Sequence, residues 1–600
     1  MTDRQIQHRL RDVRIDRRTP MMMAMAVLIG AAATLAGWVL MALIALVTNL
    51  AYHGRFSFAP ATIDLQLLGA FSIAVPALGG LIIGLMARYG SEKIRGHGIP
   101  EAMEAILIGQ SRIQPKVAIL KPLSSAISIG TGGPFGAEGP IIMTGGALGS
   151  LFAQFFHLTP VERKTLLVAG AAAGMTAIFA TPVAAVLLAL ELLLFEWKAR
   201  SFLPVIAACV AAAALRPLLF DAGPIFALAG AADLSAAGAA HQFPIIRDIP
   251  WALLIGLAAG LVSALLTLMV YGVEDLFARL PLHWMWWPCI GGLIVGLGGL
   301  FDPAALGVGY GNIRALLAGG MDTHAATTLL LVKAVVWAVA LGSGTSGGVL
   351  APVLMIGGAV GSLLALLSSG AGDGQFALFA LLGMAAVMSG TMRVPLTATL
   401  FAVELTGALS PLFLLLIACG VSYAITALLM KRSILTEKVA RRGHHILQEY
   451  GLDPFATTRV ADVMVREVAT LTGEMTLEEA VAYFSTGERR FKGYPVVDAA
   501  GRCLGMITRG DILLWARDKE DTSLTLAEVL SDRELFATTA DELVGELADR
   551  MVQADVARVP VIEPASGKLV GLMARKDLLA VRGAMLRQER ERAAFLRRRR

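Results

Sequence analysis

The sequence predicts an all-α polytopic membrane domain with broken helices, followed by a soluble α/β unit. Of the 600 residues, 56% are hydrophobic and 16% are charged, whereas soluble domains carry roughly 25% charged residues. Up to about residue 430 the apolar segments are uneven and interrupted by glycine and proline, as in transporters with discontinuous helices. Beyond residue 431 the apolar runs are too short to cross a membrane.

Both ends of the chain are basic. Residues 1–20 form an arginine-rich arm, and Arg597–Arg600 is a run of arginine. By the positive-inside tendency we expect both termini in the cytoplasm, in a multi-pass protein of the cell (inner) membrane. Topology and attraction to anionic lipid then account for the net charge of +5, and nucleic acid is not expected as a partner.

Two long apolar segments open the membrane domain. Residues 21–50 are too long for a signal-peptide core and predict a retained first helix. Leu65–Arg88 is also long enough to span about 30 Å of hydrocarbon. Shorter apolar runs follow at Val117–Ile129, Ile141–Phe156, Thr165–Phe179, Val183–Phe195 and Phe202–Leu219. A Gly/Ala-rich loop is expected near 222–250, before a second apolar block, Trp251–Met430.

The membrane domain contains an internal repeat. Residues 136–153 match residues 348–365 at an offset of 212, and residues 182–192 match residues 395–405 at an offset of 213. Two ordered matches in nearly one register are not expected by chance, even between Gly/Ala-rich helices. The domain is therefore predicted to be duplicated, with repeats at about 65–220 and 251–430.

One short stretch, Gly132–Pro140, carries an acid inside the apolar region. Glu138 is flanked there by glycines and prolines. An ionisable residue at membrane depth is costly and indicates a functional site, and irregular backbone in a bilayer survives only where it is buried or lines a cavity. The stretch predicts a broken helix with free N–H groups and a titratable gate on a solute pathway.

The C-terminal part is also duplicated. Its first copy is predicted to open at Arg459–Met464 and its second at Thr525–Leu530, with about 60 residues in each. Short apolar runs bounded by turn residues, such as Tyr494–Val497, predict buried strands. The expected bounds are 455–517 and 522–585, followed by a basic tail, 586–600.

These motifs resemble the CLC family of chloride channels and chloride/proton antiporters. The matching pieces are Gly96–Glu101, Gly136–Pro140, Gly348–Pro352 and the helices that end at Glu191 and Glu404, so the resemblance covers about residues 21–450. The tail resembles a tandem CBS-domain pair. The resemblance implies a CLC-type inverted repeat and a homodimer with one pore in each subunit.

The resemblance also implies an anion site built from backbone N–H groups. Helix N-termini attract anions without a full positive charge, which suits rapid release. The expected chloride-binding residues are His97, Gly98, Ile99, Gly136, Val349, Leu350 and Leu435. Glu138 is expected to occupy the outer anion position as a carboxylate and to leave it when protonated or displaced by chloride.

Three positions depart from the family pattern. His97 stands where the family has a serine, and it either donates an N–H to the anion or points away and leaves only the backbone. Leu435 stands in place of the pore tyrosine and has no hydroxyl. Leu192 stands where antiporters often carry an inner proton-accepting glutamate.

The leading interpretation is a voltage- or glutamate-gated channel for chloride and other small anions, gated by Glu138. The alternative is a chloride/proton antiporter with a non-standard proton route through Glu138 and Glu191. A structural hydrogen-bonding role is expected for Glu404. The apolar-region cations Lys121, Lys333 and Arg393 are expected to snorkel or to pair inside the protein.

The CBS pair offers one candidate nucleotide site. Thr508 and Asp511 resemble the family's nucleotide signature, whereas Ala574 replaces the threonine of the second copy and leaves Asp577. An adenine nucleotide is the one cofactor considered, and a purely structural, dimer-stabilising pair is equally open. No enzymatic activity is expected.

Other classes of protein fit the sequence poorly. A CBS-bearing cation transporter would need clustered intramembrane carboxylates, and a membrane metalloprotease would need a His-Glu-x-x-His helix, which the sequence lacks. A regulatory nucleotide sensor would leave the pore motifs without a purpose. The cysteines stand singly and indicate neither a disulfide framework nor a metal site: Cys209, Cys289, Cys419 and Cys503.

Overall fold

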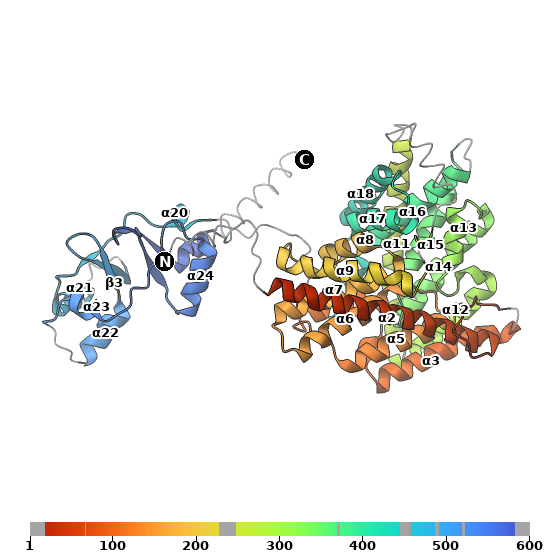
Figure 1. Ribbon diagram of the computed structural model, residues 1–600, viewed down its shortest axis with the longest axis horizontal. Helices are drawn as coiled ribbons and strands as arrows, with labels where there is room; N and C mark the ends of the chain where they lie inside the picture. Colours follow the sequence, from red (N-terminus) through yellow and green to blue (C-terminus); the bar gives the residue numbers. More distant parts are fainter. Residues whose placement is uncertain are drawn as a thin grey trace. The chain divides into compact units, whose positions relative to one another are not determined.

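The computed structural model contains two compact units, residues 1–448 and 449–600, each described here by itself (Figure 1). The structure describes residues 18–65, 68–221, 223–226, 248–368, 373–444, 455, 458–485, 491–518 and 523–581. The N-terminal arm, most of the expected 222–250 loop and the basic tail lie outside these residues.

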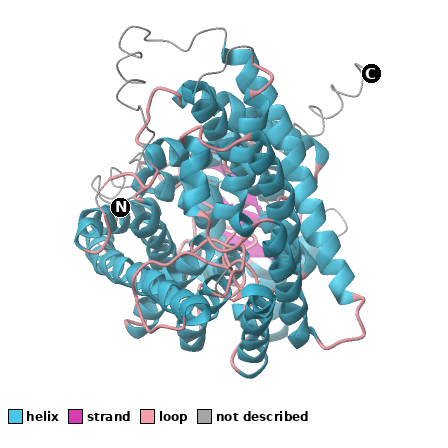
Figure 2. Cartoon of the chain, turned by 90° about the vertical axis from the view of Figure 1, so that its right-hand side faces the viewer, coloured by secondary structure: helices cyan, strands magenta, loops and turns pink. Residues whose placement is uncertain are grey.

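The membrane unit is built from helices (Figure 2). The first repeat contains α2 (Thr19–His53), α3 (Ala74–Tyr89), α4 (Ile99–Leu107), α5 (Pro115–Gly130), α6 (Glu138–Phe155), α7 (Pro160–Phe179), α8 (Pro182–Leu188) with a π turn at Ala189–Leu194, and α9 (Ala199–Leu215). The second contains α11 (Ile249–Ala278), α12 (Trp287–Phe301), α13 (Tyr310–Leu317), α14 (Thr323–Gly342), α15 (Leu350–Ala365), α16 (Asp373–Met392), α17 (Pro395–Thr406) and α18 (Leu412–Leu429).

The predicted spans agree with these helices, with two differences. The segment expected at Leu65–Arg88 begins with a short 3-10 turn, Gly69–Ile73, before α3. A further short helix, α19 (Ile434–Arg441), follows the apolar block that was expected to end at Met430, and Gly443 behind it takes a positive φ of 87°. Among the described residues, eight helices are long and apolar enough to cross a membrane.

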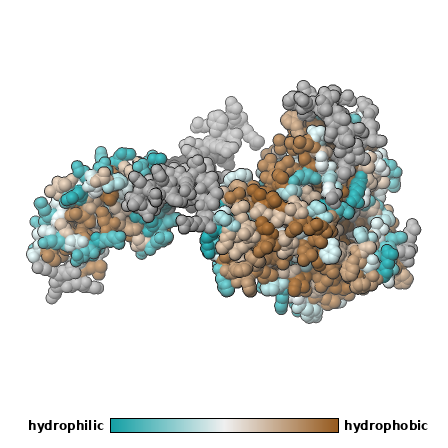
Figure 3. All heavy atoms as spheres, viewed as in Figure 1, coloured by the Kyte–Doolittle hydropathy of each residue, from teal (hydrophilic) through white to brown (hydrophobic). Residues whose placement is uncertain are grey.

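The outer surface of the membrane unit is apolar. Figure 3 shows hydrophobic side chains over most of its visible face. Leucines far from any core are widely exposed, such as Leu28 at 60% and Leu268 at 62%. Such continuous apolar exposure marks contact with a membrane or another protein.

Paired glycines bring helices of each repeat into backbone contact. A Cβ on Gly145 of α6 would lie 2.2 Å from the carbonyl oxygen of Gly170 on α7. In the second repeat, a Cβ on Gly357 of α15 would lie 2.4 Å from the carbonyl oxygen of Gly383 on α16. Small residues permit such close crossings between membrane helices. The same packing therefore occurs twice, at equivalent positions.

The C-terminal unit contains two small sheets. In chain order its elements are α20 (Val460–Val463), β1 (Leu471–Thr472), α21 (Leu477–Ser485), β2 (Gly493–Val497), β3 (Cys503–Thr508), α22 (Arg509–Asp518), α23 (Leu526–Ser531), α24 (Val544–Gln553), β4 (Arg558–Ile562) and β5 (Leu569–Ala574). Strand β2 pairs with β1 in parallel and with β3 in antiparallel fashion, and β4 pairs with β5 in antiparallel fashion.

The two copies exchange their opening segments. Val460, predicted to open the first copy, packs in the core of the second, with Leu547 and Val559. Leu526, predicted to open the second copy, packs in the core of the first. Each core therefore includes the opening segment of the other copy, and neither core forms from one copy alone.

Candidate functional site

The two repeats meet at a pair of equivalent glycines. The Gly136 N–H donates to the Gly348 carbonyl at 3.3 Å, and the Gly348 N–H donates to the Gly136 carbonyl at 2.9 Å. These glycines directly precede the N-terminal regions of α6 and α15. Their antiparallel bridge brings the N-termini of two helices, with their unpaired N–H groups, to one place.

The Glu138 carboxylate fills a space left by these glycines. A Cβ would lie 1.8 Å from Oε2 of Glu138 if placed on Gly136, and 2.5 Å from it if placed on Gly348. Glu138 is fully buried, and neither of its carboxylate oxygens has a hydrogen-bond partner among the described residues. A buried carboxylate in such a place either binds weakly to nearby N–H groups or gives way to another anion.

A third turn approaches from α4. Gly96 and Gly98 adopt φ angles of 91° and 90°, which favour glycine. A Cβ on Gly98 would lie 2.4 Å from the Gly139 carbonyl oxygen, so the start of α4 touches the first turn of α6. Gly96 also bridges to the segment before Gly348: its N–H donates to Thr345 and its carbonyl accepts from Gly347.

The structure thus brings together six of the residues predicted to bind chloride, from three separate turns. Ile99, Val349 and Leu350 are fully buried, and His97 is 2% exposed. The Nδ1 atom of His97 has no hydrogen-bond partner among the described residues. The seventh, Leu435, is buried in α19. It supplies no hydroxyl, and the nearby Tyr271 hydroxyl donates to the carbonyl of Ile434.

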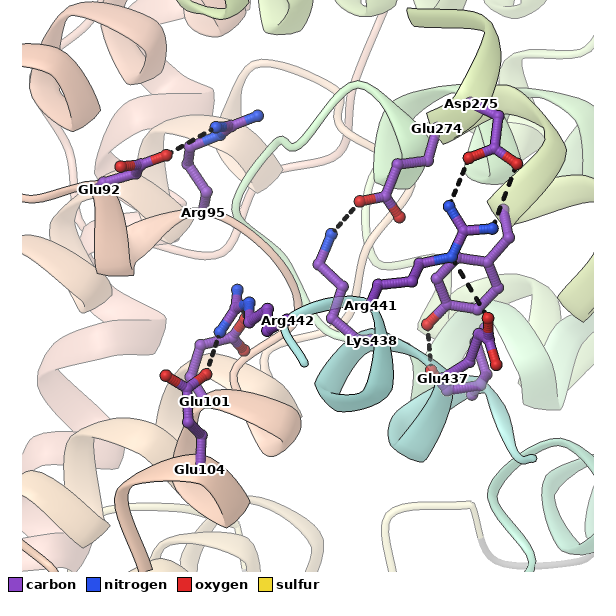
Figure 4. A network of polar contacts seen from close by, with 12 residues as sticks. Glu92, Arg95, Glu101, Glu104, Glu274, Asp275, Glu437, Lys438, Arg441 and Arg442 are labelled. Atoms are coloured by element: carbon purple, nitrogen blue, oxygen red, sulfur yellow. Dashed lines mark hydrogen bonds and ion pairs between the residues drawn. The ribbon is translucent and has the colours of Figure 1, made fainter. Parts of the chain in front are cut away.

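Polar contacts behind the α4 turn hold it in place (Figure 4). Oε2 of Glu101 accepts the Gly98 N–H at 2.8 Å, and Oε1 of Glu101 pairs with Arg442 at 3.0 Å. Arg442 also pairs with Glu104. Glu101 was not among the residues expected at the site, although its position three residues after Gly98 is the spacing of a helix capping box.

The helix α19 is tied to two other helices in the same network (Figure 4). Lys438 pairs with Glu274 at 2.5 Å, and Arg441 pairs with Asp275 on the end of α11. Arg442 reaches α4 through Glu101. The last helix of the membrane unit therefore connects α11 with the turn that precedes α4.

The three cationic side chains within the apolar segments donate hydrogen bonds to backbone carbonyls. Lys121 donates to the carbonyls of Ile94 and Gly96, and Lys333 is bound in the same way in the second repeat. Arg393 donates to carbonyls at the end of α18, including Thr426 at 3.2 Å. This agrees with the expectation of pairing inside the protein.

Glu191 and Glu404 form reciprocal helix caps. Glu404 accepts the N–H groups of Val183 and Ala184, at the start of α8. Glu191 accepts the N–H groups of Leu396 and Thr397 and the Thr397 hydroxyl, at the start of α17. Each carboxylate thus stabilises a helix N-terminus of the other repeat. Leu192 beside Glu191 is fully buried.

The CBS positions lie at the starts of short helices. Asp511 accepts from the N–H and the hydroxyl of Thr508, and it pairs with Arg533 at 3.0 Å. Burial raises the pKa of Asp511, but the hydrogen bonds from Thr508 and the nearby Arg533 outweigh it and hold the pKa below its ordinary value. In the second copy Asp577 accepts the Ala574 N–H at 2.8 Å, the one hydrogen bond of its side chain within the part of the chain that the structure describes.

Comparison with known proteins gives family matches in both units. The family model described as "Voltage gated chloride channel" matches residues 79–427, and the CBS domain model matches residues 460–518 and 526–583. A voltage-gated ClC-type chloride channel ClcB of Escherichia coli O81 (strain ED1a) is 33% identical over 376 residues, covering 62% of this chain and 87% of that protein. A putative ClcB-like chloride channel protein of Ralstonia nicotianae is 29% identical over 387 residues, covering 62% of this chain and 85% of that protein.

Solved structures share the fold. A slow cyanobacterial Cl⁻/H⁺ antiporter gives a TM-score of 0.61 at 21% identity, over 72% of this chain and 99% of that one. A eukaryotic CLC transporter gives 0.57 at 18% identity, over 93% of this chain and 97% of that one. The turns at Gly98, Glu138 and Gly348 converge, and the family model matches residues 79–427. The chain therefore belongs to the voltage-gated chloride channel family and carries two CBS domains.

Proposed function

We propose that this protein conducts chloride passively and that the Glu138 carboxylate is its gate. The observation that carries the proposal is the position of that carboxylate, buried against Gly136 and Gly348 without a hydrogen-bond partner among the described residues. An anion bound there would occupy the same space as the carboxylate. Protonation of Glu138, or competition from chloride, would therefore open the path.

Passive conduction is favoured by the surroundings of the inner proton position. Leu192 cannot carry a proton, and the Glu191 carboxylate is occupied by three donors at the start of α17. To carry a proton, Glu191 would have to give up hydrogen bonds that hold the start of α17, which makes it a poor proton relay. The relatives named as ClcB chloride channels agree with this choice.

A second candidate function is chloride/proton exchange by a non-standard inner route. His97 favours it, because its carbonyl oxygen lies against Gly139, next to Glu138, and its Nδ1 atom is buried without a partner among the described residues. The structural neighbours described as antiporters share this fold. In this candidate, a proton would pass between Glu138 and the cytoplasm by way of the imidazole.

We further propose a homodimer in a cell (inner) membrane, with cytoplasmic termini. The apolar side chains exposed on α8, α9, α17 and α18 support a contact with a second copy: Val183, Val210, Leu396 and Phe413 are each 49–59% exposed. The arginine-rich termini support the orientation.

For the CBS pair we propose one adenine-nucleotide site, at Thr508 and Asp511, which would regulate the pathway. The Asp511 carboxylate is already paired with Arg533. A ribose hydroxyl would therefore compete with the guanidinium, or Arg533 would turn to the phosphates. Asp577 lacks the threonine partner that Asp511 has.

The test of passive conduction is chloride efflux from proteoliposomes with simultaneous recording of the external pH, with and without a proton ionophore. We expect chloride to leave without stoichiometric proton movement. Uphill proton movement driven by a chloride gradient would overturn the channel proposal and support exchange, and a His97→Ser variant would then show whether the imidazole carries the proton.

A further inference from the structure

The turn that precedes α13 is the second-repeat counterpart of the turn that precedes α4. Gly307 and Gly309 stand 211 positions after Gly96 and Gly98, and all four have positive φ angles, between 62° and 91°. Each turn leads directly into a short helix, α4 or α13. The glycine turn that approaches Glu138 and Gly348 before α4 therefore has a counterpart before α13, one in each repeat. We refer to residues 307–311 as the outer turn.

A buried lysine supports each turn in the same way. Lys121 donates to the carbonyls of Ile94 and Gly96 at 2.8 and 2.7 Å. Lys333, 212 positions later, donates to the carbonyls of Ala305 and Gly307 at 2.9 and 3.1 Å. Both lysines are fully buried. Each one therefore binds two carbonyl oxygens at its turn and fixes the backbone there.

The two turns differ at one position that carries charge. At the turn before α4, residues 96–98, which we call the inner turn, Glu101 accepts the Gly98 N–H and adds a carboxylate. The equivalent residue of the outer turn is Asn312, whose amide donates instead to the Ala304 carbonyl at 2.7 Å. No described hydrogen bond uses the N–H groups of residues 308–311. The outer turn thus keeps its donors and lacks the carboxylate.

The outer turn lines a cavity of about 1230 Å³. Arg216 and Arg314 also line it, and Asp221 is the one acid among its described lining residues. The Tyr310 hydroxyl oxygen is buried and makes no hydrogen bond among the described residues. Arg216 is 6% exposed, and its hydrogen bonds to described residues go to the backbone carbonyls of Ala177 and Asp221. Arg216, Arg314 and Tyr310 therefore bring several donor groups to this cavity, against one carboxylate among the described lining residues.

We propose that the outer turn binds a small monatomic anion, chloride in the first place, as a separate position on the outer side of the Glu138 gate. The N–H groups of residues 308–311 and the Tyr310 hydroxyl would donate to the ion, and Lys333 would add its charge from behind the backbone. The outer side follows from the proposed cytoplasmic N-terminus, because the C-terminal half of α2 lines the same cavity. The inference rests on the proposed chloride transport and adds a site to it.

Bromide tests this site directly, because its anomalous scattering locates it in crystals of the full-length protein. We expect one anomalous peak between Ile99 and Leu350 and a second at the outer turn. Asn312→Asp gives the outer turn a negative charge like the one that Glu101 supplies to the inner turn, and it should abolish the second peak only. Asn312→Leu loses the same hydrogen bond to Ala304 without adding charge, and it should keep both peaks.

Flux measurements provide a second readout. In proteoliposomes with the outer face exposed, Asn312→Asp should raise the chloride concentration for half-maximal flux about tenfold, since a unit charge a few ångströms from the ion repels it. Asn312→Leu should change it less than twofold. A missing outer peak in the wild-type protein, or an outer peak that persists in Asn312→Asp, would overturn the inference. Absence of chloride flux from the wild-type protein would instead overturn the proposed function.

Discussion

Gly136 and Gly348 hydrogen-bond to each other through both their N–H and carbonyl groups, although 212 positions separate them in the chain. They are equivalent residues of the two repeats. A reciprocal antiparallel bridge between equivalent residues places a local two-fold axis between them. The Glu138 carboxylate lies beside this axis, in the space that both missing side chains leave open.

The gate can be tested by neutralising its acid. In Glu138→Gln, chloride flux should persist and lose its dependence on pH, because the amide no longer changes charge. Wild-type flux should rise as the pH falls from neutral, because a protonated carboxyl competes less well for an anion site. Stopped-flow chloride efflux at several pH values measures both. The control is Glu404→Gln, which neutralises a helix cap outside the site and should keep the wild-type pH dependence of flux. If chloride flux through Glu138→Gln still depended on pH, Glu138 would not be the gate.

The space beside Gly136 and Gly348 that holds the Glu138 carboxylate, here called the glycine cradle, can be tested without replacing Glu138. Gly136→Ala would place a Cβ 1.8 Å from Oε2 of Glu138, and its three nearest atoms all belong to that side chain, so the carboxylate must move out. We expect higher chloride flux and a weaker pH dependence. The matched control is Gly272→Ala in α11, where a Cβ meets no atom within 4 Å. An alanine there should leave transport unchanged and stabilise the helix by up to about 1 kcal/mol. Equal effects of both substitutions on flux would rule out the cradle.

The reciprocal caps predict a structural phenotype for both glutamates. Glu191→Gln and Glu404→Gln should each lower the free energy of unfolding by about 1 kcal/mol, because each weakens the cap of a helix N-terminus. Neither should alter the ratio of protons to chloride. Thermal unfolding in detergent and the proteoliposome assay test the two statements. Glu92→Gln, which removes an exposed pair with Arg95, should change stability little. A proton ratio altered by Glu191→Gln alone would revive its proton role.

The Glu101–Arg442 pair predicts coupling between α19 and the inner turn. Arg442→Gln leaves the Glu101 carboxylate, whose side chain is 4% exposed, without its cation. Loss of the partner of a buried charged group costs about 1–3 kcal/mol, and chloride affinity should fall because the Gly98 turn loosens. A double-mutant cycle with Glu101→Gln should recover part of the loss. Strictly additive effects would show that the pair is not coupled. Arg432→Gln, at a partly exposed pair with Glu437, is the control.

The CBS unit should gain stability from Asp511 in a defined pH range. Its pKa is depressed in the folded chain by Thr508 and Arg533 against the effect of burial. The contribution is therefore complete above the unfolded value of about 3.9, and it is lost as the pH falls through the lower folded value. Asp511→Asn should abolish this dependence below pH ~4. The fluorescence of Trp515, isolated by subtracting a Trp515→Phe variant, reports it, and identical acid transitions in Asp511→Asn and wild type would disprove it.

The membrane class, the duplication and the buried acid could all be predicted from local pattern. Uneven apolar segments predicted the broken helices, and the matches at offsets of 212 and 213 predicted the repeats. The acid of Gly132–Pro140 stood out because charge is costly at membrane depth. The strand at Tyr494–Val497 was also predicted, and it forms most of β2. Each of these properties resides in a few neighbouring residues or in a comparison of the chain with itself.

Contacts between distant residues were decided only by the tertiary structure. The cradle joins Gly136 to Gly348, Glu191 caps a helix that begins more than 200 positions later, and Arg442 reaches back to Glu101. The exchange of Val460 and Leu526 between the CBS cores is of the same kind. Hydrophobic periodicity reports which face of a segment is buried, but it does not identify the segment that covers it. A carboxylate in sequence alone therefore shows its charge, whereas its role as gate or cap depends on which N–H groups folding brings to it.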